Sequence, residues 1–220
     1  MSDKPSVSQK IYVDYDTSAV ERILKKLSGE ALDQAWRRAL QKTGAWIKTR
    51  VTQELSKTAK IPRKALIVGG RRSRPRLDAY FDRNDEGVMK VWLGLRPIDA
   101  HRLAYGRGAT QTRSGGVRAG QHHFPHAFLM PVYGKNGEGK RVKVMRDRVT
   151  RGGKIISEAK TIVMQRRGRK RLPLDKVTLD FQAQGNTAMQ NAAKGVADTL
   201  IKKLRSEVRF ELSKQDGNAQ

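Results

Sequence analysis

The sequence contains no cysteine, which excludes disulfides, thiol nucleophiles and cysteine-ligated zinc sites. It also has no run that approaches the roughly 18 consecutive apolar residues that a membrane-spanning helix needs. The first ten residues, MSDKPSVSQK, lack the apolar core of a signal peptide. We therefore expect the protein to stay in the cytoplasm or in a soluble assembly.

Acidic residues are scarce. The 21 Asp and Glu stand against 46 Lys and Arg, which gives the 220-residue chain a formal net charge of +25. This excess is far beyond what solubility requires and indicates a polyanionic partner. It is concentrated in three acid-poor stretches, residues 57–76, 101–137 and 160–174. Nucleic acid, an anionic membrane surface and a strongly acidic protein are the candidates, and without an apolar span we set the membrane aside.

The first part of the chain predicts helices followed by a basic arm. A helix start at residues 16–18 indicates a short helix. Apolar side chains then recur at spacings of three and four over residues 32–55, which predicts a longer amphipathic helix that ends before Pro62. Residues 57–76 hold eight Lys and Arg, no acid and several chain breakers. We expect a basic loop there that is ordered by its partner.

The middle of the chain predicts β-structure. Apolar residues alternate with polar ones, and glycine-containing turns between them fit antiparallel hairpins. Residues 105–120 hold five glycines and three arginines without an acid, so we expect a second mobile basic loop there. The expected strands are residues 79–83, 88–95, 127–133, 141–145, 160–166 and 177–181, with a hairpin turn at 84–87.

A second clear helix closes the chain. Residues 187–190 fit a capping box, and an apolar stripe continues the helix to Val208. The order of elements predicts an α+β fold, in which an antiparallel, β-sandwich-like sheet is flanked by a long N-terminal helix and a C-terminal helix and carries long basic loops. We expect one domain over 30–212, preceded by a segment 1–29 and followed by a polar tail 213–220.

The histidine cluster does not predict a metal site. His122, His123 and His126 could hold a transition metal. However, Pro125 prevents a regular helix from presenting His122 and His126 on one face, and residues 100–137 contain no Asp or Glu to complete a shell. Loop histidines near a polyanion are the favoured interpretation.

Other catalytic patterns are equally weak. Asp147, Glu158 and Lys160 faintly resemble the nuclease arrangement in which carboxylates hold a divalent metal and a lysine positions water, but such short spacings are common by chance. Residues 69–73 lack the Gly-Lys-Ser/Thr ending of a nucleotide-binding loop. We predict no enzyme, no metal and no cofactor. No base-reading motif is present either, so a nucleic acid would be contacted through its backbone.

A strand, a basic turn and a second strand follow one another in residues 162–177, IVMQRRGRKRLPLDKV. The block FPHAF lies upstream at 124–128, and the long predicted helix leads into KIPRKAL at 60–66. This order of motifs resembles the minor tail protein Z family of tailed phages and prophages. The resemblance covers residues 30–212 and is strongest over 124–181.

Two features depart from the family pattern. His126 stands where the family usually has glycine, and residues 134–160 are longer than the simple hairpin expected there. These departures affect the local strand pairing, whereas the order of the motifs and the basic composition carry the resemblance.

The resemblance implies a structural virion protein. It implies a tail-completion or neck protein that forms a homohexameric ring at the head-proximal end of the tail, with a fold similar to tail-tube and head-to-tail connector subunits. The implied partners are the tail terminator, the tail tube, the head–tail connector proteins and the backbone of the phage DNA. The implied location is the tail or neck of the virion, reached from the host cytoplasm during assembly.

Physical reasoning agrees with a ring, because closed symmetry multiplies the charge of one chain around a lumen. We expect residues 57–76 and 106–120 to become ordered only in that ring. A sequence-independent nucleic-acid-binding protein outside any virion stays open as the alternative, and an enzyme is a distant third. The residues expected to contact DNA or a neighbouring ring are Arg63, Lys64, Arg71, Arg72, Arg74, Arg107, Arg113, Arg118, Arg166, Arg167, Arg169, Lys170 and Arg171.

Overall fold

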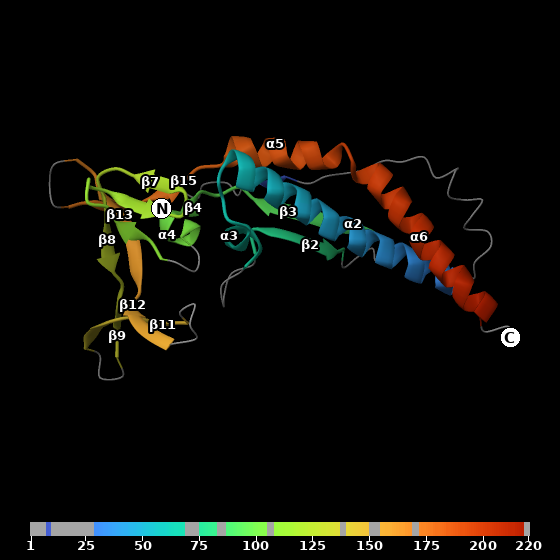
Figure 1. Cartoon of the computed structure of the whole chain (residues 1–220), viewed down its shortest axis with the longest axis horizontal. Coiled ribbons are helices and arrows are strands. Elements are labelled where there is room, and N and C mark those ends of the chain that lie inside the picture. The colour runs from blue at the N-terminus through green and yellow to red at the C-terminus, as the bar shows by residue number, and fades with distance from the viewer. Residues whose placement is uncertain are drawn as a thin grey trace. The chain divides into compact units, whose positions relative to one another are not determined.

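The chain has a mixed α+β fold with an N-terminal helix, several small antiparallel sheets and a C-terminal helix (Figure 1). The span predicted as one domain divides into two compact units. Unit 1 comprises Met1–Arg96 with Phe181–Gln220, and unit 2 comprises Pro97–Asp180. The computed structural model describes residues 8–9, 29–68, 75–82, 87–104, 108–136, 140–149, 155–168 and 172–217. The short helix predicted at 16–28 lies outside these residues.

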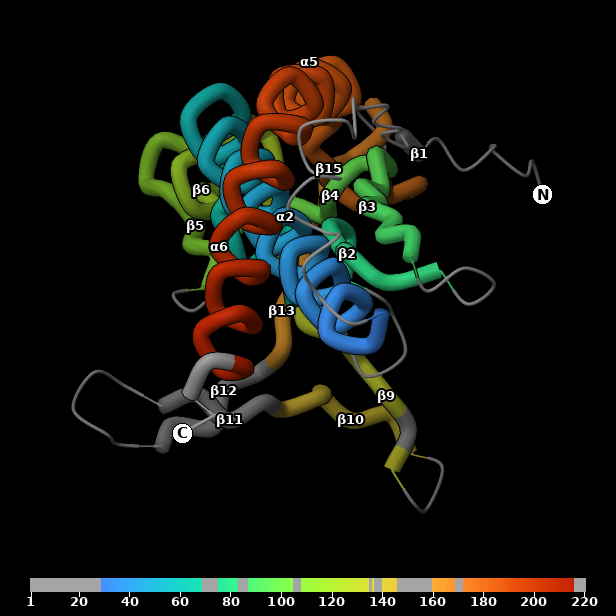
Figure 2. The backbone as a smooth tube through the Cα atoms, turned by 90° about the vertical axis from the view of Figure 1, so that its right-hand side faces the viewer, coloured from blue at the N-terminus to red at the C-terminus, as the bar shows by residue number. Residues whose placement is uncertain are grey.

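The long predicted helix of unit 1 is confirmed as α2 (Gly29–Thr58). Its apolar stripe is buried, with Ala39, Val51 and Leu55 fully covered. Helix α6 (Val196–Gly217) lies along α2 in both Figure 1 and Figure 2, and buried side chains of the two helices, Leu40 and Leu204 among them, form one cluster. The spacing that predicted each helix therefore also predicts the faces that pack together.

The predicted C-terminal helix is two helices, α5 (Gln182–Ala193) and α6. The capping box predicted at 187–190 is wrong, because α5 begins five residues earlier and the Thr187 hydroxyl donates to the carbonyl of Ala183, 3.1 Å away, inside the helix. Gly195 lies at the break between the helices. A Cβ at Gly195 would lie 3.1 Å from the Trp46 ring, so the close approach of α2 explains the glycine.

The prediction of a loose basic arm at 57–76 is wrong for its first part. Residues Arg63–Ile67 form a short helix, α3, and Ile61 and Leu66 are fully buried. An arm that becomes ordered only in a ring does not fit this segment, because its apolar residues already pack within one copy of the chain. The remainder of the arm, residues 69–74, lies outside the described part.

The first predicted hairpin is confirmed in unit 1. Strand β2 (Leu77–Phe81) pairs antiparallel with β3 (Met89–Gly94), and Leu77 lies opposite Leu93 with both side chains fully buried. A short strand that the sequence did not predict, β1 (Ser8–Gln9), pairs with the other edge of β3. Most of the predicted turn at 84–87 lies outside the described residues.

The described residues of unit 2 form short strands and one short helix. Its small sheets have the orders β14-β13-β8, β5-β6-β7, β15-β4, β10-β9 and β11-β12. The finer prediction of one sandwich-like sheet is therefore not confirmed. The elements are β4 (Ile98–Asp99), α4 (Ala100–Leu103), β5 (Thr110–Gln111), β6 (Val117–Ala119), β7 (His122–Phe124), β8 (Ala127–Pro131), β9 (Tyr133–Lys135), β10 (Arg141–Lys143), β11 (Met145–Val149), β12 (Ile155–Ala159), β13 (Thr161–Arg166), β14 (Leu174–Lys176) and β15 (Thr178–Leu179).

The second predicted loop, at 105–120, is also wrong where it is described. Strands β5 and β6 occupy part of it, and Val117 and Ala119 are fully buried. These two side chains alternate with exposed Arg118, so the segment carries a strand pattern that its glycines and arginines conceal. The expectation that 106–120 becomes ordered only in a ring fails for the same reason.

The strands predicted at 160–166 and 127–133 are confirmed as β13 and β8. Strand β13 pairs with β8 on one side and β14 on the other, so the stretch 162–177 holds two antiparallel strands, and residues 169–171 between them lie outside the described part. The strand predicted at 177–181 is the shorter β15, which pairs with β4. No helix in the described part of the chain has the length and apolar character to cross a bilayer.

Candidate nucleic-acid interface

The turn between β13 and β14 presents two of the predicted arginines. Arg166 lies opposite Leu174 at the last paired position of the two strands. The backbone N–H of Arg167 then donates to the carbonyl of Pro173 over 3.1 Å, and Gly168 adopts a φ of 93°, a conformation that favours glycine. The start of the basic turn is thus held by its strands, as the sequence predicts.

The two arginines of this turn differ in their availability. Arg167 forms a bidentate pair with Asp175, with Nε and Nη2 each 2.8 Å from a carboxylate oxygen. These hydrogen bonds lower the pKa of Asp175 and raise the pKa of Arg167. Arg166 is exposed and forms no ion pair with any described residue. Arg166 is therefore the better candidate for an external anion, and the charge of Arg167 is largely satisfied within the chain.

Arg118 lies in β6 and Arg113 in the segment that connects β5 to β6, and both are exposed. Arg113 lies in a tight turn, in which the backbone N–H of Thr112 donates to the carbonyl of Gly116 over 3.0 Å and its hydroxyl donates to that of Gly115 over 2.7 Å. The turn leaves the arginine side chain facing solvent on a defined backbone. Both residues are suitable for contact with a polyanion.

A glutamine connects this sheet to strand β8. The Gln111 side chain donates to the carbonyl of Ala127 over 3.4 Å and accepts from the N–H of Leu129 over 3.3 Å. It thereby satisfies backbone groups on the outer edge of β8, which would otherwise be open to another strand. Ala127 lies opposite Gln165, the residue before Arg166. Strand β8 therefore lies between the strand that leads to Arg113 and the strand that ends at Arg166.

Arg63 and Lys64 lie in unit 1, in the first turn of α3, and both are exposed. Buried Ala65 and Leu66 fix the helix that presents them. Arg63 also lines a hollow of about 430 Å³ together with Lys48 of α2. These residues thus form a basic surface separate from the turns of unit 2.

The remaining predicted contact residues lie outside the described part of the chain. The six that are described belong to three places: α3, the sheet β5-β6-β7 and the β13–β14 turn. The residues outside are Arg71, Arg72, Arg74, Arg107, Arg169, Lys170 and Arg171.

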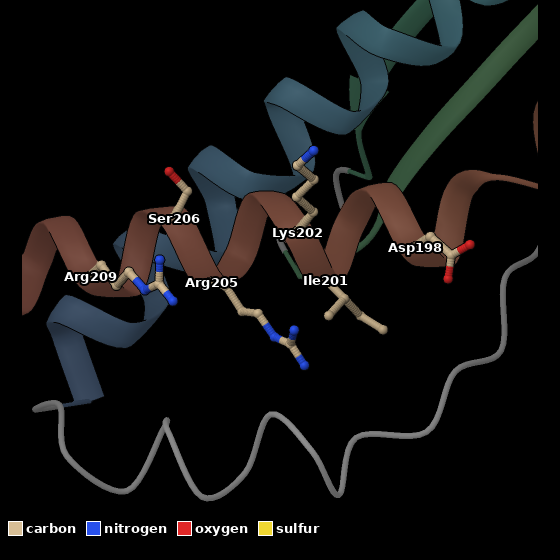
Figure 3. A pocket seen from close by; sticks show the side chains of 6 residues that line it. All are labelled: Asp198, Ile201, Lys202, Arg205, Ser206 and Arg209. Carbon is tan, nitrogen blue, oxygen red and sulfur yellow. The ribbon is translucent and has the colours of Figure 1, made fainter.

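One group of cations was missed by the sequence analysis. Lys202, Arg205 and Arg209 of α6 line a shallow hollow together with Ile201, Ser206 and the acidic Asp198 (Figure 3). The sequence signal was available, because the three cations recur at spacings of three and four on the side opposite the apolar stripe. It was overlooked because cations on a helix usually form only a solvated face.

The histidine cluster has a structural role. His123 Nε2 lies 3.2 Å from the carbonyl of Gly115 and 3.5 Å from the hydroxyl of Thr112, where it supports the turn of the sheet. The His122 ring stacks on Phe124 with 6.1 Å between centroids. Among the described residues no group of three or more His, Asp or Glu could hold a metal ion.

The carboxylates of the weak nuclease pattern are not partners in the sheet. Strands β11 and β12 place Asp147 opposite Ser157 and Glu158 opposite Arg146. The backbone register therefore gives no support for a two-carboxylate site at this hairpin.

No protein-family model, curated protein or solved structure matches this chain.

Proposed function

We propose that this protein is a non-enzymatic structural component of a tailed-phage virion, related to the minor tail protein Z family. It acts as a tail-completion or neck protein at the head-proximal end of the tail and joins tail to head. Its basic surfaces surround the path of the DNA and contact phosphates without reading sequence. Tail terminator, tail tube and connector proteins are its neighbours.

The observation that carries the proposal is the position of Arg166. It lies at the end of a paired strand, exposed and without an ion-pair partner among the described residues, inside the stretch that resembles the family. A cation fixed by two strands loses little conformational freedom when it binds a phosphate. The net charge of +25 provides the long-range attraction that such contacts require.

The homohexameric ring belongs to the same proposal and is supported by the short sheets of unit 2. The two-stranded hairpins β9–β10 and β11–β12 meet the β8–β13 pair through backbone hydrogen bonds of Val132, Val144 and Lys160, and they leave open edges. Tyr133, Val142 and Met145 on these hairpins are 42, 40 and 53 % exposed. Pairing with a neighbouring subunit would cover these side chains and extend the sheets toward the sandwich of tail-tube and connector subunits.

Mass photometry at moderate salt, followed by electron microscopy, tests the ring. We expect a closed assembly of about six copies, in line with cyclic symmetry, that retains duplex DNA in its lumen. Arg166→Glu should keep the ring and lose the DNA. Lys194→Glu, an equal charge reversal at an exposed residue at the C-terminal end of α5, serves as the matched control.

The contrary result is a monomer at every concentration that still binds DNA tightly. That outcome would favour the alternative of a nucleic-acid-binding protein outside any virion. A ring in which Arg166→Glu retains DNA as well as the control would remove the β13–β14 turn from the DNA path.

A further inference from the structure

We propose that the exposed side of α6 is a second polyanion site, which binds the phosphate backbone of a nucleic-acid duplex. It consists of Lys202, Arg205 and Arg209 with the hydroxyl of Ser206, and we call it the α6 cationic face. It belongs to unit 1 and to none of the predicted basic loops. It does not depend on the virion role.

Helix geometry places these side chains together. At 100° per residue, the positions of Lys202, Arg205 and Arg209 fall within a sector of about 60°. All three positions lie on the side of α6 that lines the hollow, whereas Leu204 and Val208 on the other side are 2 % and 1 % exposed. Figure 3 shows the cationic side chains leaving one stretch of the helix. The helix is thus anchored by its apolar side and presents a line of cations on the other.

One acid of α6, Asp198, lines the same hollow and offsets part of its charge, whereas Glu207 and Glu211 face away from it. Glu207 and Glu211 are 4 % and 6 % exposed, and they pair with Lys42 and Arg38 of α2. The charges of these two glutamates are therefore neutralised by ion pairs within unit 1. No ion pair with a described residue involves the three cations of the face.

The spacing of the face fits a phosphate backbone. The seven helical steps from Lys202 to Arg209 rise about 10.5 Å along the helix, close to three 3.4 Å steps of one duplex strand. Ser206 lies between the cations and can donate to a phosphate oxygen, as serine hydroxyls commonly do in protein–DNA complexes. A duplex laid along α6 can therefore contact several of these groups together.

The composition of the face favours nucleic acid over an acidic protein. Protein interfaces place apolar and aromatic anchors at their centre. The one apolar residue of this hollow, Ile201, already packs partly against the cluster between α2 and α6. Phosphate contacts need cations and donors, and the three cations and Ser206 of this face outnumber its acid, Asp198.

The test uses the full chain and a random-sequence DNA duplex of about 20 base pairs, with binding followed by fluorescence anisotropy over a salt series. The variant is Lys202→Gln, Arg205→Gln, Arg209→Gln combined. Each lost phosphate contact lowers the slope of log K against log salt by about 0.9. We expect the slope of log K against log salt to decrease by the amount that corresponds to two or three lost phosphate contacts. The affinity near 0.1 M salt should be at least about tenfold weaker.

The control removes the same charge from dispersed lysines, as Lys57→Gln, Lys143→Gln, Lys176→Gln combined, which are all exposed. Helix content measured by circular dichroism should stay unchanged in both variants, because none of the six side chains belongs to the buried core. Equal losses of affinity in the two variants would overturn the proposal, since net charge alone would then explain binding. Unchanged DNA binding with lost binding of polyglutamate would overturn it in favour of an acidic protein. Ring formation is measured separately by mass photometry, so a negative result for the α6 cationic face would not decide the proposed function.

Discussion

Unit 1 and unit 2 are stabilised in different ways. Unit 1 buries long apolar stripes of α2, α5 and α6 against each other and against β2 and β3. Unit 2 has small sheets of two or three strands, which are joined by tight turns and by side-chain hydrogen bonds such as that from Gln111 to the carbonyl of Ala127. The comparison indicates that side-chain packing dominates the stability of unit 1, whereas backbone conformation at turns carries a larger share in unit 2.

The largest expected effects come from the same core substitution made once in each unit. Leu55 in α2 is 0 % exposed and Leu103 in α4 is 2 % exposed. Leu55→Ala and Leu103→Ala should each cost about 2–5 kcal/mol, because both leave a cavity. If the units unfold independently, Leu55→Ala accelerates hydrogen exchange in α2 and leaves that of β13 unchanged, and Leu103→Ala does the reverse.

One shared calorimetric transition that both variants shift equally would contradict the independence of the units. The conservative variants Leu55→Met and Leu103→Met keep most of the volume and serve as controls. They should recover most of the lost stability.

The next largest difference between the units should appear in the destabilisation caused by one glycine substitution in each. Gly116 has a φ of 89°, and a Cβ there would lie 2.5 Å from the backbone carbonyl oxygen of Phe124. Gly116→Ala should therefore destabilise unit 2 by about 2 kcal/mol or more, through both strain and overlap. In unit 1, a Cβ at Gly44 would overlap Sδ of the flexible Met89 side chain and would lie 3.1 Å from the Cβ of Ala79 in β2.

Gly44→Ala should change stability by less than about 1 kcal/mol, because the gain in helix propensity offsets the displacement of Met89. Thermal or urea unfolding of both variants measures the difference. A Gly44→Ala variant as unstable as Gly116→Ala would show that the contact of α2 with the sheet is as rigid as the turn in unit 2.

The same difference explains how much of the fold the sequence predicted. The stripe of α2 was predicted because its period is sustained over many turns, and the β2–β3 and β13–β14 pairs because alternation and turn residues agree. The packing of Leu66 in α3 and of Val117 in β6 was missed, since one or two apolar residues among many cations give no period. The break at Gly195 was missed because its cause, the approaching ring of Trp46, is a tertiary contact.

The candidate site was predicted less completely. The sequence predicted Arg166 as the start of the basic turn, whereas it is the last residue of β13. The pairing of Arg167 with Asp175 was not predicted, because it depends on the register of β13 with β14. The positive charge of the α6 cationic face depends on the direction in which the acidic side chains of α6 point. That Glu207 and Glu211 turn toward α2 is settled by packing against Lys42 and Arg38, which are 165 and 173 positions away along the chain.

Ion pairs should show a smaller contrast between the units. Glu207 is nearly buried and pairs with Lys42, while Arg38 lies 3.9 Å away. Lys42→Met should cost about 1–2 kcal/mol, because a buried carboxylate loses its closest donor. Combining it with Glu207→Leu should restore stability, since apolar replacements of buried pairs are often neutral or better.

In unit 2 the pair of Arg167 with Asp175 is solvent-exposed, so Arg167→Met should leave the unfolding midpoint unchanged within error. A double-mutant cycle in unit 1 and the single variant in unit 2 measure both outcomes. A loss at Arg167 as large as that at Lys42 would show that the turn, too, depends on its ion pair.

The smallest expected effect is a pH dependence confined to unit 2, where all four histidines lie. Burial of His101 lowers its pKa below 6.5; nearby Arg102, Lys160 and Lys176 add to this, and Asp99 opposes it. As the pH falls through the ordinary pKa, the unfolded state binds the proton first, so unit 2 loses stability progressively. Hydrogen exchange of β13 between about pH 7.5 and about pH 5.5, corrected for intrinsic rates, should reveal this loss, with α2 as the internal control. His101→Gln should abolish it, and an undiminished loss in that variant would assign the effect to other groups.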